Sequence, residues 1–288
     1  MTARKWLVFL FAMLWAAAAG KTAEPRQPKG SLPAPGVSPA RPFKAVHVIV
    51  VLCDNRNQGI VPVPPALGNG QDPMRNLYWG ALYGVRTFFS KSSFWQEVHS
   101  WTPPAGQPVL AGAVFASRSG PEAYVVAEAF DGARMASALH AFLAACHGQS
   151  HSREIVVRRG SRQVKLPVGN RADMVCFVGH NGLMDMEAPR VDPAPDGSPR
   201  PSAALVLACR SRDYFAVPLA NSRCPLQVLT TQLMSPEAYT LDAVIRSWAR
   251  GDNPAGIREA AAAAYAGYQK CSLPAARRMF VAGHDLRY

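Results

Sequence analysis

The chain has 288 residues, 49% of them hydrophobic, and a formal net charge of +12. This hydrophobic content is ordinary for a globular protein. Roughly 245 residues remain once a leader and a linker are set aside, which is enough for one large α/β domain. The positive charges are scattered, and their densest cluster lies in a short turn region at 158–165. Composition therefore argues against a nucleic-acid partner, whereas a cationic surface suits either acidic substrates or the anionic bacterial envelope.

Residues 1–20 have the pattern of a secretory signal peptide. Arg4 and Lys5 precede an apolar stretch at 6–19, which is short for a membrane span and ends in small residues. The pattern predicts export and a periplasmic or extracellular location, and it leaves open an uncleaved anchor. Residues 21–44 are rich in Pro and indicate a linker without a core. A single domain is expected over 45–288.

Apolar runs and helix-like segments alternate beyond the linker. Strands are expected at 45–53, 109–117, 123–129, 155–158, 163–166 and 228–231, and in the apolar runs that begin at Met174 and Ala203. Helices are expected at 77–90, 133–147, 235–249 and 257–270. This alternation predicts an α/β fold, a three-layer sandwich in which helices flank a mostly parallel central sheet.

A polar loop at 54–76 follows the first expected strand and is rich in Asn and Gln. So many hydrogen-bonding amides just past a buried strand indicate either a well-ordered structural loop or the rim of a functional site. The pattern alone leaves both interpretations open.

Six cysteines in an exported chain allow three disulfides. Cys53, Cys176 and Cys209 lie in or at the end of apolar strand-like runs, where a buried free thiol is common. At most one or two bridges are therefore expected, and Cys224 with Cys271 is the best candidate pair. No metal site and no cofactor are expected.

Two of the apolar runs stop at reactive side chains. The run from Met174 stops at His180, and the run from Ala203 stops at Cys209. Because ligands gather at the carboxyl ends of parallel strands, neighbouring strands would place a base and a nucleophile at one edge. Gly179 and Gly182 allow a sharp turn around the His, and their amides are candidate oxyanion donors.

The order of strand, His-x-Gly, loop, strand, Ala-Cys and small polar residues resembles the caspase-like cysteine peptidases, which include caspases, metacaspases, legumains and gingipains. The polar residues 54–57 after the first strand add to the likeness. Residues 207–215 are similar to the legumain segment in which Ala-Cys-x-Ser precedes a Phe. The likeness covers about residues 45–250 in element order and implies a caspase-like fold.

The resemblance implies a role for each matching residue. Cys209 would be the nucleophile, His180 the general base and acid, and Asn55 or Asp54 the group that orients His180. The family usually has His-Gly, whereas here Asn181 lies between His180 and Gly182. The amide of Asn181 can still donate to an oxyanion, but its side chain would crowd the site.

The expected substrate is a peptide or protein, and its contacts are expected from Arg56, Asn181, Gly182 and Asp185. In the resembled family, residues near the end of the first strand help to form the primary specificity pocket. There Arg56 would favour an acidic residue and Asp54 a basic one, while Asp185 with Glu187 would attract basic side chains. These alternatives stay open.

The sequence thus predicts an exported cysteine hydrolase, a thiol protease that works through an acyl-enzyme. Transpeptidation would use the same intermediate. The alternative is a catalytically inactive caspase-like domain that serves as an envelope binding or scaffolding module.

Overall fold

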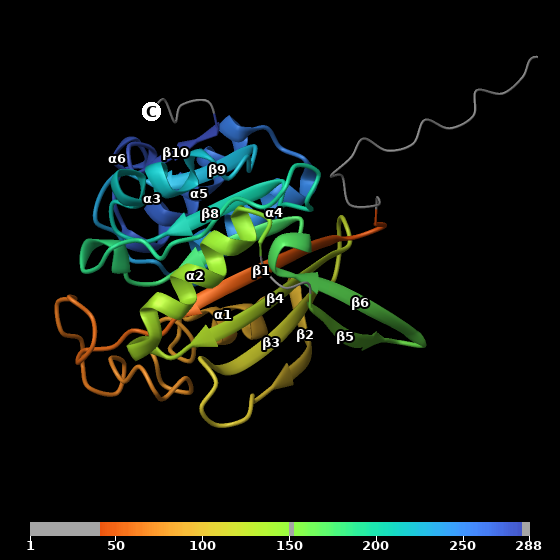
Figure 1. Ribbon diagram of the computed structural model, residues 1–288, viewed down its shortest axis with the longest axis horizontal. Coiled ribbons are helices and arrows are strands. Elements are labelled where there is room, and N and C mark those ends of the chain that lie inside the picture. The colour runs from red at the N-terminus through yellow and green to blue at the C-terminus, as the bar shows by residue number, and fades with distance from the viewer. Residues whose placement is uncertain (1–40, 150–152, 284–288) are drawn as a thin grey trace, which may run out of the picture. The chain divides into compact units, whose positions relative to one another are not determined.

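The computed structural model describes residues 41–149 and 153–283 (Figure 1). The expected signal peptide and residues 21–40 of the expected linker lie outside the described residues. The domain opens with strand β1, Lys44–Val51. In the described ranges, no helix is both long enough and apolar enough to cross a membrane.

Within the described residues, eight strands form one mixed sheet in the order β10-β9-β8-β7-β1-β4-β3-β2. After β1, these are β2 (Trp95–Trp101), β3 (Val109–Ser117), β4 (Ala123–Phe130), β7 (Met174–Val178), β8 (Ala203–Leu207), β9 (Leu226–Thr230) and β10 (Phe280–Ala282). The central strands β4, β1, β7, β8 and β9 are parallel, and the antiparallel pairings lie toward the two edges. The predicted mostly parallel α/β sheet is confirmed.

Helices cover both faces of the sheet (Figure 1). One face carries α1 (Val85–Lys91), α4 (Ala238–Arg250), α5 (Pro254–Gln269) and α6 (Leu273–Arg277). The other carries α2 (Met135–Cys146) and α3 (Ser211–Ala220), together with the hairpin β5 (Arg153–Arg159) and β6 (Arg162–Val168). Short 3-10 turns lie at Gly132–Arg134, Gly169–Arg171 and Gly182–Met184. The arrangement is compatible with a three-layer sandwich.

Strand β1 is apolar apart from Lys44 and His47, because both of its faces are buried. Val46, Val48 and Val50 pack into the core under α4 and α5, whereas Ile49 and Val51 pack into the core under α2. A parallel strand that is covered on both faces has no solvent side, so its residues read as one hydrophobic run rather than an alternating one.

Strand β1 also marks the point where the chain reverses direction across the sheet. The chain first builds β4, β3 and β2 on one side of β1 and then β7, β8, β9 and β10 on the other. In open α/β sheets, a crevice forms outside the carboxyl ends of the strands at such a switch point. A functional site is therefore expected at the edge of the sheet where β1, β7 and β8 end.

Several boundaries differ from the sequence prediction. The helix expected over 77–90 is present only from Val85, because the preceding chain folds into tight turns around Asn76. The Asn76 side chain accepts from the Cys53 amide at 3.0 Å and donates to the Cys53 carbonyl at 2.8 Å. Helix α4 begins at Ala238 rather than at 235, since Ser235 and Pro236 form a turn beside a cavity.

The cysteine prediction needs correction. All six cysteines lie in the described ranges and all are free thiols. The expected Cys224–Cys271 bridge is wrong, because Cys224 is buried under α3 and β9 whereas Cys271 is exposed after α5.

Candidate functional site

Strands β7 and β8 carry His180 and Cys209 to the same edge of the sheet. They pair in parallel, with Val178 opposite Leu207, so each reactive residue lies two positions beyond this pair. Both side chains line one cavity of about 420 Å³. The cavity is also bordered by the loop after β1 and the segment after β9. A volume of this size is within the range of small-molecule sites, roughly 300–1,000 Å³.

Cys209 lies in a tight turn between β8 and α3. Arg210 adopts a left-handed conformation, with φ of 48°, and α3 starts at the next residue. The Thr230 hydroxyl on β9 donates to the Ala208 carbonyl, and the Arg210 amide donates to the Gln232 carbonyl at 2.8 Å. These bonds fix the turn that presents the thiol.

The thiol itself is held against the segment after β9. Cys209 Sγ donates to the Met234 carbonyl and accepts from the Met234 amide, both at 3.4 Å. The side chain is half-buried, in contrast to Cys53, Cys146 and Cys176, which are fully buried. Cys209 is thus the cysteine that combines access to a cavity with a fixed position.

His180 is held by Asp185. The distance from His180 Nε2 to Asp185 Oδ2 is 2.6 Å, and the same oxygen accepts from the Gly59 amide at 3.0 Å. Burial alone would raise the pKa of Asp185, but the Gly59 amide and His180 outweigh it and hold the pKa below its ordinary value. Because Asp185 engages Nε2, Nδ1 is the ring nitrogen left for proton transfer.

Asp54 and Asn55, predicted to orient His180, make their hydrogen bonds elsewhere. Asn55 donates to the Val63 carbonyl at 2.8 Å and accepts from the Val63 amide at 3.0 Å. Asp54 accepts from the amides of its own loop and from the Gln71 side chain at 2.9 Å. The orienting contact expected from one of them is made by Asp185.

The Asn/Gln-rich loop combines the two interpretations that its composition left open. Its amide side chains are structural, as the bonds of Asn55 and Asn76 show. Its apolar residues Ile60, Val61 and Val63 form a wall of the cavity. The polar residues therefore shape the loop and the apolar ones face the site.

Asn181 does not crowd the site, contrary to the sequence expectation. Its side chain is fully buried, donates to the Cys209 carbonyl at 2.7 Å and accepts from the Leu183 amide at 3.2 Å. The carboxamide thus ties the turn that carries His180 to the turn that carries Cys209.

The Gly179 and Gly182 amides, expected as oxyanion donors, make hydrogen bonds within the protein. The Gly179 amide donates to the Leu207 carbonyl at 3.2 Å, and the Gly182 amide donates to the His180 carbonyl at 3.0 Å. Gly182 packs against Met135 of α2, where a Cβ would lie 2.3 Å from the Met135 Cγ. The glycine thus permits close packing against α2.

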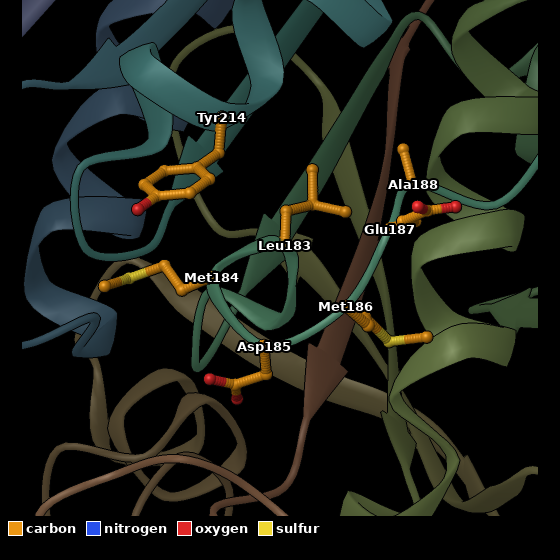
Figure 2. A pocket seen from close by; sticks show the side chains of 7 residues that line it. All are labelled: Leu183, Met184, Asp185, Met186, Glu187, Ala188 and Tyr214. Atoms are coloured by element: carbon orange, nitrogen blue, oxygen red, sulfur yellow. The ribbon is translucent and has the colours of Figure 1, made fainter.

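Charged residues expected to contact substrate lie outside this cavity. Arg56 is exposed and its amide donates to Asp54 at 2.9 Å. Asp185 and Glu187 line a neighbouring open pocket of about 460 Å³, shown in Figure 2. Met184 lines both hollows, so the turn at Gly182–Met184 separates them.

Sequence reasoning missed Asp185 as the partner of His180 and missed the wall from the segment after β9. An acid five residues after the His was a usable signal, because the short turn at Gly182–Met184 brings the chain back toward the imidazole. The sequence contains no comparable indication for the wall residues after β9, which are Leu233, Met234 and Glu237. They lie beside the cavity because β9 pairs with β8, and this pairing is not apparent from the sequence.

Comparisons with protein-family models, with curated proteins and with solved structures found no match for this chain.

Proposed function

We propose that this chain is a cysteine hydrolase, a peptidase on a caspase-like fold, with Cys209 as nucleophile and His180 as general base and acid. The observation that carries the proposal is that both side chains line one cavity at the carboxyl ends of paired parallel strands. Cys and His in one site are the residue types that acyl transfer through a thioester requires.

The reaction divides into acylation and deacylation. In this scheme the Cys209 thiol exchanges its hydrogen bond to the Met234 carbonyl for one to His180 Nδ1, which takes the proton. The sulfur then attacks the substrate carbonyl carbon. The carbon–nitrogen bond then breaks, and the leaving amine takes the proton from His180. Water next loses a proton to His180 and attacks the thioester carbonyl carbon. The carbon–sulfur bond then breaks, the acid is released, and His180 returns the proton to the Cys209 sulfur.

Asp185 supports this cycle by holding the imidazole. A carboxylate on Nε2 fixes the ring orientation and favours the protonated ring that forms during each step. The lowered pKa of Asp185 keeps this carboxylate ionised at neutral pH. Cys209, His180 and Asp185 then act as a triad.

The place of action proposed with this function is outside the cytoplasm, in the periplasm or the extracellular space. Support comes from the sequence pattern of residues 1–20, with Arg4 and Lys5 before an apolar stretch.

The test is covalent labelling of the purified protein with a thiol-directed acyl probe, located by peptide mass analysis. We expect fast labelling of Cys209, loss of this fast labelling in Cys209→Ala with slow labelling of Cys271 left, and a fall of roughly 100-fold or more in rate in His180→Ala. Cys271→Ala is the matched control, because Cys271 is a free and exposed thiol after α5. Its labelling rate should equal that of the wild type.

Acyl labelling that is as fast in Cys209→Ala, or in His180→Ala, as in the wild type would contradict the proposal. The inactive binding or scaffolding module would then be the better account.

A further inference from the structure

The cavity that His180 and Cys209 share has mainly apolar walls, contributed by four separate segments. Six of the wall residues are Ile60, Val63, Leu77, Met184, Leu233 and Met234. They follow β1, β7 and β9 or lie in the turns before α1. A wall assembled from several segments is a built feature of the fold rather than one loop that lies over the surface.

The charged residues that the sequence suggested for substrate selection lie outside this cavity. Neither Arg56, Asp54 nor Asp185 is among its lining residues. The carboxylate in the lining belongs to Glu237, which accepts from the Tyr239 hydroxyl at 2.8 Å and from Gln269 Nε2 at 3.1 Å. Both bonds end on Glu237 Oε2, and they tie this oxygen to α4 and α5.

Three apolar wall residues are unusually accessible. The exposed fraction is 87% for Val61, 67% for Leu233 and 40% for Met184. Large apolar side chains that gather around a hollow mark a surface that a ligand covers. Removing their area from water stabilises a complex by about 25 cal/mol per Å².

We propose that this cavity is the subsite for an uncharged aliphatic or aromatic substrate side chain, such as that of Leu, Met or Phe, beside the bond that Cys209 attacks. This inference rests on the proposed function and names its substrate class. An Asp side chain would lose hydration on entry and meet the Glu237 carboxylate, and burial of an unpaired charge is costly. A Lys or Arg side chain would lose hydration against mainly apolar walls, and its one carboxylate partner there already accepts two hydrogen bonds. An apolar side chain has no such cost.

The direct test compares acyl probes that are identical except for the side chain beside the reactive carbonyl. We expect the second-order rate of Cys209 labelling to be about tenfold or more higher with Leu than with Ala, a difference typical of hydrophobic pockets. Probes with Lys or Asp should react no faster than the Ala probe. A Lys probe faster than the Leu probe would overturn the inference, and loss of that advantage in Glu237→Gln would assign the preference to Glu237.

A pair of surface variants locates the preference in the cavity. Leu233→Glu places a carboxylate on the wall at an exposed position, so the Leu-to-Lys rate ratio should fall several-fold. Val217→Glu adds the same charge at a residue that is 78% exposed on α3 and does not line the cavity. If the Leu-to-Lys rate ratio is the same in both variants, the preference for Leu does not arise in this cavity and the inference is overturned.

A binding measurement separates this inference from the proposed chemistry. Cys209→Ala cannot form an acyl-enzyme, yet it keeps the apolar walls. Short fluorescent peptides that differ only in a central Leu or Lys should bind it with affinities about tenfold apart, the Leu peptide tighter. Equal affinities, or tighter binding of the Lys peptide, would overturn the subsite even if the wild type labels on Cys209. Tighter binding of the Leu peptide supports it even if labelling fails.

Discussion

At the residue scale, Asp185 is the group on which the proposed chemistry can be tested most selectively. Its carboxylate joins His180 Nε2 at 2.6 Å and the Gly59 amide at 3.0 Å, so it links the base to the loop after β1. The side chain is 39% exposed and does not line the cavity with Cys209. Its removal should therefore affect the base more than substrate binding or folding.

We expect Asp185→Asn to lower kcat by at least about tenfold and to leave KM nearly unchanged, because the ring loses the carboxylate that fixes its orientation. Asp185→Glu should recover part of the rate. Asp192→Asn is the control, since Asp192 forms an exposed ion pair with Arg190. A rise in KM with unchanged kcat would show that Asp185 contacts substrate instead of positioning the base.

The residues of the site differ in how far sequence could predict them. His180 and Cys209 were predictable, because each ends an apolar run and parallel neighbours align such ends. The function of Asn181 was not, since the residue after His180 could point into the site or under it. Only the packing against Cys209 shows that its side chain is buried.

At the element scale, the hairpin β5–β6 is fastened to the sheet by a buried carboxylate. Glu128 on β4 accepts from Arg153 at the start of β5 at 2.6 Å and contacts His47 Nε2 on β1 at 2.9 Å. The Gly169 amide donates to His47 Nδ1, so Nε2 is the nitrogen that carries a proton. Burial would raise the pKa of Glu128, but His47 and Arg153 outweigh it and lower the pKa to about 2.

This network predicts a specific loss of stability in acid. The folded pKa of Glu128 lies below its ordinary value of 4.5, so its contribution is full above that pH and is lost as pH falls through about 2. The free energy of unfolding should drop by an amount on the order of 3 kcal/mol across this window. The Glu128→Gln variant should be less stable than the wild type at pH 7. Its free energy of unfolding should not show the decrease in acid that protonation of Glu128 causes in the wild type. Denaturant titrations at a series of pH values measure it.

Glu154→Gln is the control on the same hairpin, because Glu154 is exposed on β5. It should change stability by less than about 0.5 kcal/mol and keep the acid profile of the wild type. If Glu128→Gln loses stability in acid as steeply as the wild type, other carboxylates account for the loss. Arg153→Ala removes the half-exposed partner of Glu128 and disturbs the core less than Glu128→Gln does. Its acid profile can be compared with that of the wild type in the same way.

Some elements could be predicted from their own residues, whereas others could not. The central strands were predictable because both of their faces are buried and their sequences are mainly apolar, interrupted by His47 in β1 and Glu128 in β4. Strand β2 was not expected, since Trp95–Trp101 is an edge strand with mixed exposure and no clear alternation. Helix α3 was also missed, because it contains Pro218 and follows the Cys209 turn without a capping side chain.

At the scale of the whole molecule, a core on both faces of the sheet holds the chain together without disulfides. Burial raises the pKa of the Cys53 thiol to about 11, with Asp54 adding to the effect, and burial raises the pKa of Cys224 to about 12. Burial also raises the pKa values of Cys146 and Cys176. Cys209 is half-buried and Cys271 is exposed.

This distribution predicts how the thiols react in solution. In the native protein at neutral pH, a chromogenic aromatic disulfide should modify Cys209 and Cys271 within minutes, because reaction needs access and the thiolate form. All six cysteines should react once the chain is unfolded in denaturant without reductant. Cys209→Ala and Cys271→Ala should each remove one fast-reacting thiol.

Fewer than six reactive thiols before reduction, with six after it, would show a disulfide and contradict the structure. Adding reductant should also leave the unfolding midpoint unchanged, since the folded core contains no bridge to break.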